Sequence, residues 1–594
     1  MSINSVREDE EQKDSVKIKV ILRLFKYMLA YKKQIILVLA CMFLSLGISV
    51  INPLLLERAI DVEIKGGDWN GLVIVVAISL AISVIYMLVA KYWMKTMAKV
   101  SNNVLLTIRD NLYSHIQTLS FSFFDSRPTG KILARVIGDV NSLKDVIQST
   151  VTQLLPDLLT VIVVFVMMLA RSPWLTLSAV AALPIIIAGM YVAEILAHKR
   201  WQVLRKKSSN ISAFVHEDFS GIGIVQSFNA EKESREEFSE LVDEHRKAFR
   251  DAVVVADAFS PTIEISWGIG TFLLYYIGIR KLGLDAVGVG TYTAFAIYLS
   301  MFWGPIRNLA SYYNKLVTNI SAAERVFDIL DTPAEVADTP DAYELPDISG
   351  KVEFENVSFA YPDEPEKYVL HNVSFTVNPG ETVALVGPTG AGKTTIVSLI
   401  SRFYNSTEGQ VLVDGHNLMS VTINSLRRQM GVMTQENYLF SGTIRENIKY
   451  GRLDASDEEM IQAAKAVHAH EFIMKLEKGY DTEISERGSS LSIGQRQLLA
   501  FARTMVSNPA ILVLDEATSS IDTHTEILVQ QGIESLLKNR TSFVIAHRLS
   551  TIKNADRIFV IDDGGIQEAG NHEELMAEKG SYYELYQAQF KNIR

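Results

Sequence analysis

Beyond its midpoint, the 594-residue chain reads Gly387-Pro388-Thr389-Gly390-Ala391-Gly392-Lys393-Thr394, followed by Thr395. This run has the phosphate-binding pattern G-x-x-x-x-G-K-[ST], and it follows a short strand-like segment, Thr382–Val386. Its glycines let backbone N–H groups approach a phosphate chain, Lys393 places a cation beside the outer phosphates, and Thr394 offers a hydroxyl to Mg²⁺. The sequence therefore predicts a nucleotide site at a strand–loop–helix junction.

A second apolar run, Ile511-Leu512-Val513-Leu514, ends in two carboxylates, Asp515 and Glu516. A buried strand that ends in this way suits a metal-bound nucleotide. We expect Asp515 to orient Mg²⁺, directly or through water, and Glu516 to polarise the attacking water. The pair predicts hydrolysis of the nucleotide as well as binding.

The chain divides into two halves of different charge. Residues 1–333 carry 34 Lys and Arg against 31 Asp and Glu, whereas residues 334–594 carry 23 against 37. An Asp- and Pro-rich linker at 331–349 separates them, and strand-like runs alternate with helical ones after it. We expect an α/β nucleotide-binding domain over residues 350–594.

The first half contains six long apolar runs. They lie at 34–56, 71–90, 151–170, 174–196, 263–279 and 287–302. Most approach the ~20 residues that a helix needs to cross a bilayer. We therefore expect an α-helical transmembrane domain with six spans over residues 34–330, preceded by a cytoplasmic segment at 1–33.

The distribution of charge predicts the orientation of these spans. Lys and Arg gather before the first run and after the second and fourth, whereas residues 57–70 are rich in acids. Both termini and the nucleotide-binding domain are expected in the cytoplasm, without a cleaved signal peptide. The two long gaps between runs fall on the cytoplasmic side, and their helical spacing predicts helices that continue there and turn.

Composition excludes several other classes. The single cysteine, Cys41, rules out an intrachain disulfide and a cysteine-cluster metal site, and the net charge of −11 argues against nucleic acid as a partner. Ionisable residues within or beside the spans are expected to face a polar cavity or a partner. They are Glu57, Arg58, Asp157, Glu194, Glu264 and Arg307. Asp157 and Glu264 lie deepest, and Glu264 is a candidate for direct substrate contact, with an interfacial or cytoplasmic position as the alternative.

Further motifs carry a resemblance to a known family. The segment at 488–497, just before the apolar run that ends in Asp515, resembles the ABC signature, usually L-S-G-G-Q. It reads Gly488-Ser489-Ser490-Leu491-Ser492-Ile493-Gly494-Gln495-Arg496-Gln497. Other matches follow in the family's order: Tyr361 in Phe359-Ala360-Tyr361-Pro362, Gln435, Asp522 in Ser520-Ile521-Asp522, and His547 in Ile545-Ala546-His547-Arg548. Phe123-Phe124-Asp125, followed by Pro128-Thr129-Gly130, resembles the first intracellular segment of exporters. From about residue 20 to 590, the chain resembles a bacterial half-size ABC exporter subunit of the multidrug type.

The resemblance implies ATP and Mg²⁺ as ligands and a specific division of roles. Two ATPase domains would close head-to-tail, so that each site combines one phosphate loop with the partner's signature, here Leu491, Ser492, Ile493, Gly494 and Gln495. Tyr361 would stack on adenine, Gln435 would sense the nucleotide, and His547 would hold the γ-phosphate beside the catalytic Glu516. Asp522 would belong to the D-loop, and Thr394, Gln435 and Asp515 would hold Mg²⁺. The helix turns near 114–121 and 213–220 would contact the ATPase domains, the second through His216, Glu217 and Asp218.

One residue departs from the family pattern. Ile493 stands where the signature usually has glycine, while Glu516 is present. In heterodimeric bacterial exporters, one subunit has an altered signature and the other lacks the catalytic glutamate. The chain resembles the first of these subunits, so we favour a heterodimer, with a homodimer that tolerates Ile493 as the alternative.

The function expected from these features is ATP-driven export of amphipathic compounds, such as drugs or lipids, across the cell membrane. The expected partners are a second half-transporter, the lipid bilayer and the amphipathic substrate. A lipid flippase would use the same architecture and remains an alternative. An ATP-gated sensor or channel is a third reading, against which Glu516 and His547 argue because they favour turnover.

Overall fold

The computed structural model describes residues 18–181, 183–257, 259–282, 288–434, 437–485, 488, 490–515, 523–546 and 549–590. The chain forms two compact units. The first comprises residues up to Ser114 together with Ile132–Asp331, and the second comprises His115–Lys131 together with the chain from Thr332 onward. A short segment from the helical half of the sequence, His115–Lys131, thus belongs to the unit that contains the phosphate loop.

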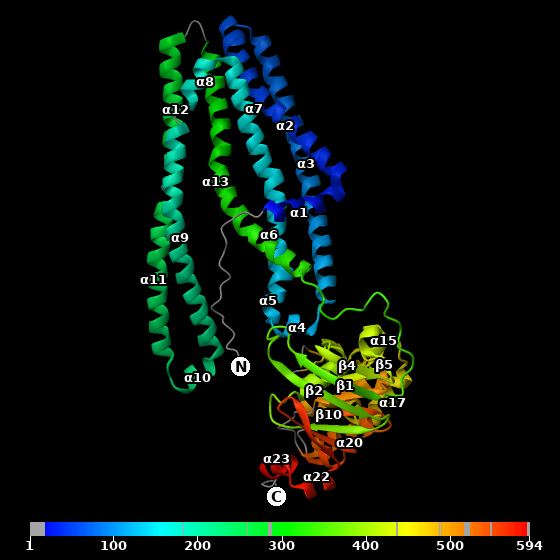
Figure 1. Cartoon of the computed structure of the whole chain (residues 1–594). Coiled ribbons are helices and arrows are strands. Elements are labelled where there is room, and N and C mark those ends of the chain that lie inside the picture. The colour runs from blue at the N-terminus through cyan, green and yellow to red at the C-terminus, as the bar shows by residue number, and fades with distance from the viewer. Residues whose placement is uncertain are drawn as a thin grey trace. The chain divides into compact units, whose positions relative to one another are not determined.

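The first unit is built from helices only, within its described residues (Figure 1). The helices are α1 (Ile18–Met28), α2 (Lys32–Arg58), α3 (Trp69–Ile116), α5 (Thr129–Ala134), α6 (Val140–Ser149), α7 (Leu155–Arg171), α8 (Pro173–Val180), α9 (Leu183–Ser220), α10 (Ile222–Ser227), α11 (Glu231–Asp257), α12 (Phe259–Leu282) and α13 (Val289–Asp331). A 3₁₀ turn, η1 (Leu29–Tyr31), joins α1 to α2, and the π-helical turns η2 (Ala59–Ile64), η3 (Arg135–Asp139) and η4 (Thr150–Leu154) extend α2, α5 and α6.

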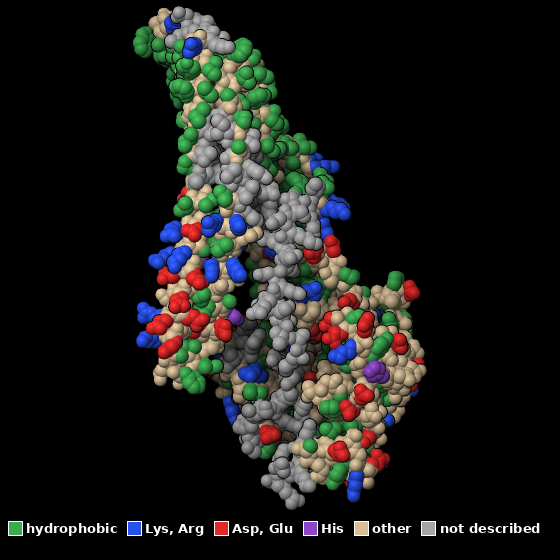
Figure 2. Space-filling view, turned by 60° about the vertical axis from the view of Figure 1, so that its left-hand side comes forward, with side chains coloured by type: hydrophobic (Ala, Val, Ile, Leu, Met, Phe, Trp, Pro, Cys, Tyr) green, Lys and Arg blue, Asp and Glu red, His purple; other side chains and the backbone are tan. Residues whose placement is uncertain are grey.

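Three helical segments among the described residues are long and apolar enough to cross a membrane. They are Lys19–Ile64, Trp69–Ile116 and Thr129–Arg171, and they contain the first three apolar runs of the sequence. The other three runs fall in α8 and α9, in α12 and in α13, so the count of six spans stays a prediction. Figure 2 shows hydrophobic side chains gathered toward one end of this unit, whereas charged side chains follow the arm formed by α9 and α11.

The expected continuation of the helices beyond the apolar runs is confirmed for the described residues, whereas their cytoplasmic position stays a prediction. The helix α3 continues without a break over 48 residues, and α9 runs over 38 residues before the chain reverses through α10 into α11. Lys207 of α9 and Glu244 of α11 form an ion pair at 2.6 Å across this arm. His216, Glu217 and Asp218 lie near the end of α9, and Asp218 accepts a hydrogen bond from Ser234. Their contact with an ATPase domain stays a prediction.

The buried centre of the helical unit is largely aromatic and aliphatic. Side chains from α2, α7, α8, α12 and α13 form one cluster, which includes Val50, Met168, Leu175, Leu274, Phe295, Tyr298 and Trp303. The Tyr298 hydroxyl donates to the backbone oxygen of Val50 at 2.8 Å, so this buried polar group has a partner.

A polar cross-link joins the end of α2, the end of α7 and the start of α13. Arg171 and Thr291 both donate to Oε1 of Glu57, at 2.7 and 2.8 Å. The Asp61 carboxylate accepts from the backbone N–H groups of Gly290 at 2.7 Å and Thr291 at 3.0 Å. These N–H groups lie at the beginning of α13, where the helix dipole favours a negative charge. The acids near the spans therefore connect three helix ends.

The remaining ionisable residues beside the spans have several environments. Arg58 pairs with Glu63 at 3.2 Å, and Asp157 accepts a hydrogen bond from the Asn308 amide at 3.1 Å. Glu264 is an exposed residue of α12, and its contact with substrate stays a prediction. The side chains of Glu194 and Arg307 lie outside the described residues.

The second unit is an α/β domain with two main sheets. Its larger sheet has the strand order β12 (Gly565–Gly570), β11 (Arg557–Asp562), β3 (Thr382–Val386), β10 (Thr541–Ile545), β9 (Ile511–Asp515) and β6 (Met430–Met433). Only β12 is antiparallel to its neighbour. The smaller, antiparallel sheet has the order β2 (Tyr368–Val377), β1 (Val352–Ala360), β4 (Glu408–Val413) and β5 (His416–Asn417), and the short strands β7 (Gly442–Thr443) and β8 (Glu483–Ile484) pair separately.

Helices cover the larger sheet and supply the rest of the core. They are α14 (Lys393–Ile400), α15 (Ile423–Arg427), α16 (Ile444–Lys449), α17 (Asp457–Ala466), α18 (His470–Met474), α19 (Ile493–Ser507), α20 (Thr523–Leu537), α21 (Leu549–Lys553), α22 (His572–Glu578) and α23 (Ser581–Phe590), with the 3₁₀ turns η5 (Leu418–Ser420) and η6 (Gly479–Asp481). The short helix α4 (Phe121–Asp125) also belongs to this unit. Strands β9 and β10 are almost wholly buried, as expected for central parallel strands.

The cross-link at the start of α13 leaves no room for a side chain at Gly290. A Cβ atom there would lie 2.6 Å from the Glu57 backbone oxygen and 2.8 Å from Cγ of Asp61. We predict that Gly290→Ala displaces Asp61 and lowers the unfolding temperature of the full chain by a few degrees, for a cost of about 1–3 kcal/mol. Gly304→Ala is the matched control, because a Cβ at that position of the same helix meets nothing within 4 Å. Equal unfolding temperatures for the two variants in lipid would contradict this account of the cross-link.

Candidate functional site

The phosphate loop begins where β3 ends, and its backbone conformation depends on glycine. Gly387, Gly390 and Gly392 have φ angles of 148°, 87° and 106°, in the region that other residues rarely adopt. A Cβ at Gly387 would lie 2.1 Å from the Ile561 backbone oxygen, whereas one at Gly390 would meet open space. The loop is thus fixed against the sheet on one side and open at its tip, which suits the approach of a phosphate chain.

Lys393 lies at the start of α14 and turns back over the loop. Its Nζ donates to the backbone oxygens of Gly387 at 2.8 Å and Pro388 at 2.7 Å. Burial lowers the pKa of Lys393, while the negative charge of Asp515 opposes this shift. The cation is therefore held at the mouth of the loop, where the negative charge of Asp515 acts on it.

The two threonines after Lys393 differ in exposure. Thr394 is exposed, so its hydroxyl is accessible to a ligand at the loop. Thr395 is buried, and its Oγ1 lies 3.1 Å from the Tyr361 hydroxyl. A role of Thr395 in contacting nucleotide stays a prediction, whereas its role in holding Tyr361 is visible in the structure.

The parallel register brings Asp515 to the same edge of the sheet as the loop. In the central strand β10, Ile545 pairs with Leu385 of β3 on one side and with Asp515 of β9 on the other. The residues present thus fit a nucleotide-bound Mg²⁺: an exposed threonine hydroxyl on the loop and a carboxylate at the end of a nearby strand. Sequence analysis predicted both positions.

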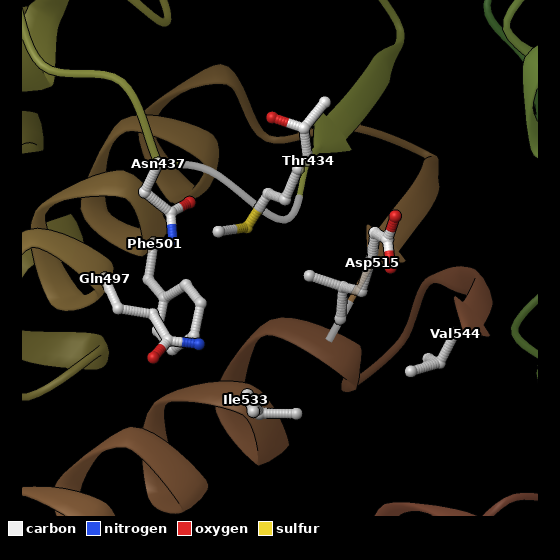
Figure 3. A pocket seen from close by; sticks show the side chains of 9 residues that line it. Thr434, Asn437, Gln497, Phe501, Asp515, Ile533 and Val544 are labelled. Atoms are coloured by element: carbon white, nitrogen blue, oxygen red, sulfur yellow. The ribbon is translucent and has the colours of Figure 1, made fainter. Parts of the chain in front are cut away.

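A small cavity lies beside Asp515 (Figure 3). Its volume is about 20 Å³, and Thr434, Gln497, Phe501 and Asp515 are among the residues that line it. This is enough space for a water molecule. Gln497 comes from α19, and its buried Oε1 has no hydrogen-bond partner among the described residues. The cavity therefore lies between α19 and the strand that carries Asp515.

The signature residues lie at the beginning of α19, where Ser492 and Ile493 are exposed. Ser492 caps this helix, because its Oγ accepts from the Gln495 N–H at 3.2 Å, while Gln495 Oε1 accepts from the Ser492 N–H at 3.0 Å. Leu491 and Gly494 are buried. Ile493 is 43% exposed at the first helical position, so its side chain does not fill the core of its own domain.

Four residues expected at the site lie outside the described residues. They are Gln435, Glu516, Asp522 and His547. The strand β9 ends at Asp515, the residue that precedes Glu516, and β10 ends two residues before His547. Their roles stay predictions.

Tyr361, expected to stack on adenine, belongs to an aromatic cluster behind the loop. Its ring contacts Phe359 and Tyr404 edge-on, with ring centroids 4.9 and 5.2 Å apart. Burial raises the pKa of Tyr361, so its hydroxyl stays protonated at neutral pH. Tyr404 was not identified from the sequence as a functional candidate.

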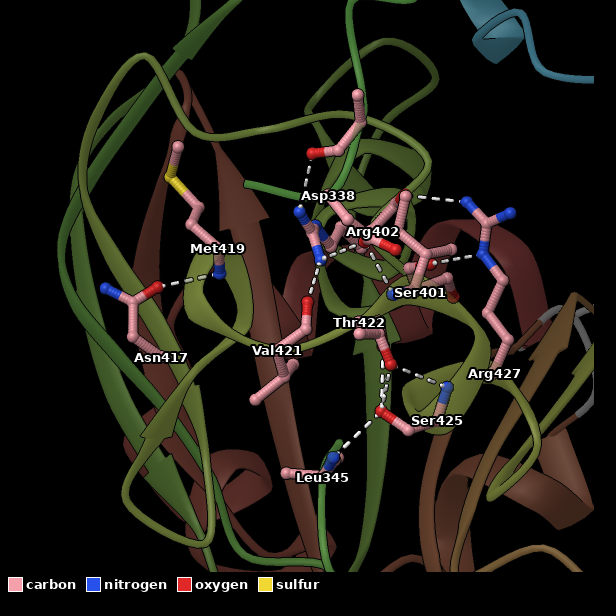
Figure 4. A network of polar contacts seen from close by, with 12 residues as sticks. Asp338, Leu345, Ser401, Arg402, Asn417, Met419, Val421, Thr422, Ser425 and Arg427 are labelled. Atoms are coloured by element: carbon pink, nitrogen blue, oxygen red, sulfur yellow. Dashed lines mark hydrogen bonds and ion pairs between the residues drawn. The ribbon is translucent and has the colours of Figure 1, made fainter. Parts of the chain in front are cut away.

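Sequence analysis also missed three residues next to Tyr404, namely Arg402, Phe403 and Arg427, which we call the platform (Figure 4). Arg402 is 2% exposed and donates to the backbone oxygens of Val421 and Ala337, the latter at 3.1 Å. Arg427 donates to the Arg402 backbone oxygen at 2.8 Å, and its guanidinium lies 4.9 Å from the centre of the Phe403 ring. These contacts fix the turn that presents Phe403 and Tyr404. An arginine inside an apolar segment is the only sequence signal for this arrangement.

The platform and Tyr404 contact the helix α4, which belongs to the same unit. The rings of Phe121 and Phe403 lie 4.6 Å apart, and the Tyr404 hydroxyl donates to Oδ2 of Asp125 at 2.8 Å. Ser120 donates to Glu335 at 3.2 Å beside them. The contact expected at 114–121 is therefore present at the end of that range, through Phe121, and it extends beyond it to Asp125. The extension beyond residue 121 was not predicted, because α3 ends at Ile116 and a second short helix, α4, follows it.

Comparison with known protein families gives matches in both halves of the chain. Residues 35–306 match the family described as ABC transporter transmembrane region, and residues 370–519 match the family described as ABC transporter. The two matches fall on either side of the linker at 331–349.

Individual relatives and one solved structure are similar over most of the chain. The Bacillus subtilis (strain 168) protein described as uncharacterized ABC transporter ATP-binding protein YknV is 40% identical over 96% of this chain and 94% of the relative. The ATP-dependent lipid A-core flippase of Syntrophus aciditrophicus (strain SB) is 40% identical over 83% of this chain and 82% of the relative. The putative multidrug export ATP-binding/permease protein YgaD of Bacillus subtilis (strain 168) is 38% identical over 96% of this chain and 100% of the relative. A bacterial Atm1-family ABC exporter with ATP bound has a similar structure, with a TM-score of 0.77, 27% identity and coverage of 95% of this chain and 99% of that one.

Proposed function

The chain belongs to the ABC transporter family, and from this premise we propose that it is one half of an exporter that uses ATP hydrolysis to move amphipathic compounds across the cell membrane. The observation that carries the proposal is the phosphate loop with Lys393 and Asp515 at one edge of the sheet, in a chain whose other half consists of long apolar helices. The likeness to proteins named as multidrug exporters and a lipid flippase supports this class of substrate.

The proposed organisation keeps the boundaries expected from the sequence. Residues 1–33 form a cytoplasmic segment, 34–330 a transmembrane domain with six spans, 331–349 a linker and 350–594 the ATPase domain. Both termini lie in the cytoplasm. The long helices α3 and α9 support a transmembrane domain that extends well beyond the bilayer.

The proposed ATP site divides its tasks among residues of the second unit. The backbone N–H groups of the loop and Lys393 bind the phosphates, Tyr361 stacks on adenine, and Glu516 and His547 align and polarise the attacking water. Thr394, Asp515 and Gln435 hold Mg²⁺, which neutralises phosphate charge when bound. The exposed Thr394 hydroxyl and the position of Asp515 beside the loop support this assignment.

A charge-neutral substitution at Glu516 tests the catalytic assignment. We predict that Glu516→Gln leaves ATP binding in place and reduces hydrolysis by about 10²–10⁴-fold, because the amide cannot act as a general base. Binding and turnover are measured in the assembled transporter in lipid. Glu526→Gln is a matched control on α20, beyond the strand end, and it should hydrolyse ATP at the normal rate. Turnover of Glu516→Gln within a few-fold of wild type would overturn the role of Glu516.

The exposed position of Ile493 supports a two-subunit assembly with one weakened ATP site. Ser492 and Ile493 form the beginning of α19, where the helix can offer N–H groups to a phosphate of the opposing subunit. A branched side chain at this position would crowd that approach. We therefore propose a heterodimer in which Glu516 serves the competent site, while a homodimer that tolerates Ile493 is the alternative.

Replacement of Ile493 tests this interpretation. Because Ile493 is 43% exposed and does not fill the core, Ile493→Gly should preserve the fold while opening the approach to phosphate. We predict that it raises ATP turnover in the assembled transporter by at least about fivefold, since a single donor to transition-state charge is worth considerably more. Ile493→Val, which keeps the branch at Cβ, is the control and should not raise turnover. An unchanged rate in Ile493→Gly would count against the steric argument.

Lipid translocation is the second candidate function, favoured by the 40% identity to a protein named as a lipid A-core flippase. The two candidates separate in sealed vesicles that contain the transporter. ATP-dependent movement of headgroup-labelled lipid between leaflets would favour the flippase, whereas accumulation of an amphipathic dye in the lumen would favour general export.

A further inference from the structure

A continuous series of side-chain contacts leads from the phosphate loop to the intracellular helix α4. Thr395 of α14 contacts the Tyr361 hydroxyl at 3.1 Å, the Tyr361 ring packs edge-on against Tyr404 at 5.2 Å with an interplanar angle of 87°, and the Tyr404 hydroxyl donates to Asp125 at 2.8 Å. All four residues belong to the second unit. No other described residue both packs against Tyr361 and hydrogen-bonds to α4 among these contacts.

We propose that Tyr404 is a positioning residue that couples occupancy of the nucleotide-base site at Tyr361 to the position of α4 in the same chain. The inference rests on the proposed function, because it takes Tyr361 as the residue on which adenine stacks. It goes further, because it proposes that binding of the base, and not only of the phosphates, affects the position of α4.

The surroundings of Tyr404 leave it little freedom to move independently of its neighbours. The residue is 6% exposed, and Phe359 packs against its ring with centroids 5.6 Å apart. Packed interiors transmit small displacements because neighbouring groups cannot absorb them. A shift of the Tyr361 ring on stacking would therefore move the Tyr404 ring, and with it the hydroxyl that contacts Asp125.

The hydrogen bond at the far end of the series is directional and charge-assisted. Burial, followed by the contact with Asp125, raises the pKa of Tyr404, so the phenol stays protonated over the physiological range. It donates to one oxygen of a carboxylate, which is a stronger bond than one between neutral groups. The backbone on which Tyr404 stands is in turn held by Arg402, whose guanidinium reaches Val421 and Ala337.

A purely structural role for Tyr404 predicts a different behaviour. In that case, the hydroxyl would simply attach α4 to the domain, and its removal would loosen α4 to the same extent with or without a base in the site. Coupling predicts instead that the response of α4 to the base is lost. A comparison of ATP with inorganic tripolyphosphate, which has the phosphates but no base, separates the two roles.

The experiment is hydrogen–deuterium exchange of residues 115–131 in the assembled full-length transporter in lipid. Every sample carries Glu516→Gln to preserve the bound nucleotide, and each ligand is used with Mg²⁺ at a saturating concentration established by titration. With Tyr404 intact, we expect ATP to slow exchange of this segment about fivefold more than tripolyphosphate does, which is within the effect of one hydrogen bond. In Tyr404→Phe, the two ligands should have effects within about twofold of each other.

Matched variants define what the result means. Asp125→Asn keeps an oxygen acceptor and should retain the ATP-specific protection, whereas Asp125→Ala should lose it. Tyr368→Phe is the control, because it removes a hydroxyl that donates to Glu408 at 3.3 Å, away from α4, and it should behave like Tyr404-intact protein.

Three outcomes would overturn the inference. They are ATP-specific protection that persists in Tyr404→Phe, equal loosening of the segment with both ligands, and no difference between the ligands when Tyr404 is intact. Failure of ATP to bind in the titration would instead contradict the proposed function itself, and the two failures are therefore distinguishable.

Discussion

The register of three parallel strands is the constraint on which the rest of the second unit depends. Because β10 pairs with both β3 and β9, the end of β3 and Asp515 reach the same edge of the sheet. The phosphate loop can then turn through its positive-φ glycines into α14, and Lys393 can lie between the loop and the carboxylate. The same helix carries Thr395, which holds Tyr361, and it leads into the turn with Arg402, Phe403 and Tyr404. A shift of the strand register by one residue would separate the loop from Asp515. It would also displace α14 and the turn that follows it.

The helical unit depends on a different balance. Among its described residues, the buried polar side chains are Ser45, Glu63, Ser101, Thr176 and Ser178, and polar contacts between helices join the helix ends. Asp61 and Glu57 connect helices that are far apart in the sequence, and Gly288 and Gly290 make room for the Asp61 carboxylate. These contacts fix where α13 begins relative to α2 and α7.

The sequence was sufficient where a local pattern determines the structure. The strand expected at Thr382–Val386 is β3 with the same bounds, and the run before Glu516 is β9, because apolar segments next to glycines or carboxylates are unambiguous. It was insufficient where partners are distant. Arg402 stands inside an apolar segment, but only the fold shows that it reaches the linker and Val421. Asp61 and Gly290 are 229 residues apart, and α4 begins after a turn that helical periodicity alone did not reveal. The roles of Gln435, Glu516, Asp522 and His547 still rest on the sequence.

The claim most open to direct test is that Ile493 weakens the ATP site that it completes, so that this chain needs a different partner. The decisive measurement is the rate of ATP hydrolysis by the chain purified alone in lipid, beside its own Glu516→Gln variant. The account predicts turnover no higher than that of the variant, in folded protein that binds ATP. Robust turnover that the variant loses would contradict it, because two copies of the chain would then form a competent ATPase.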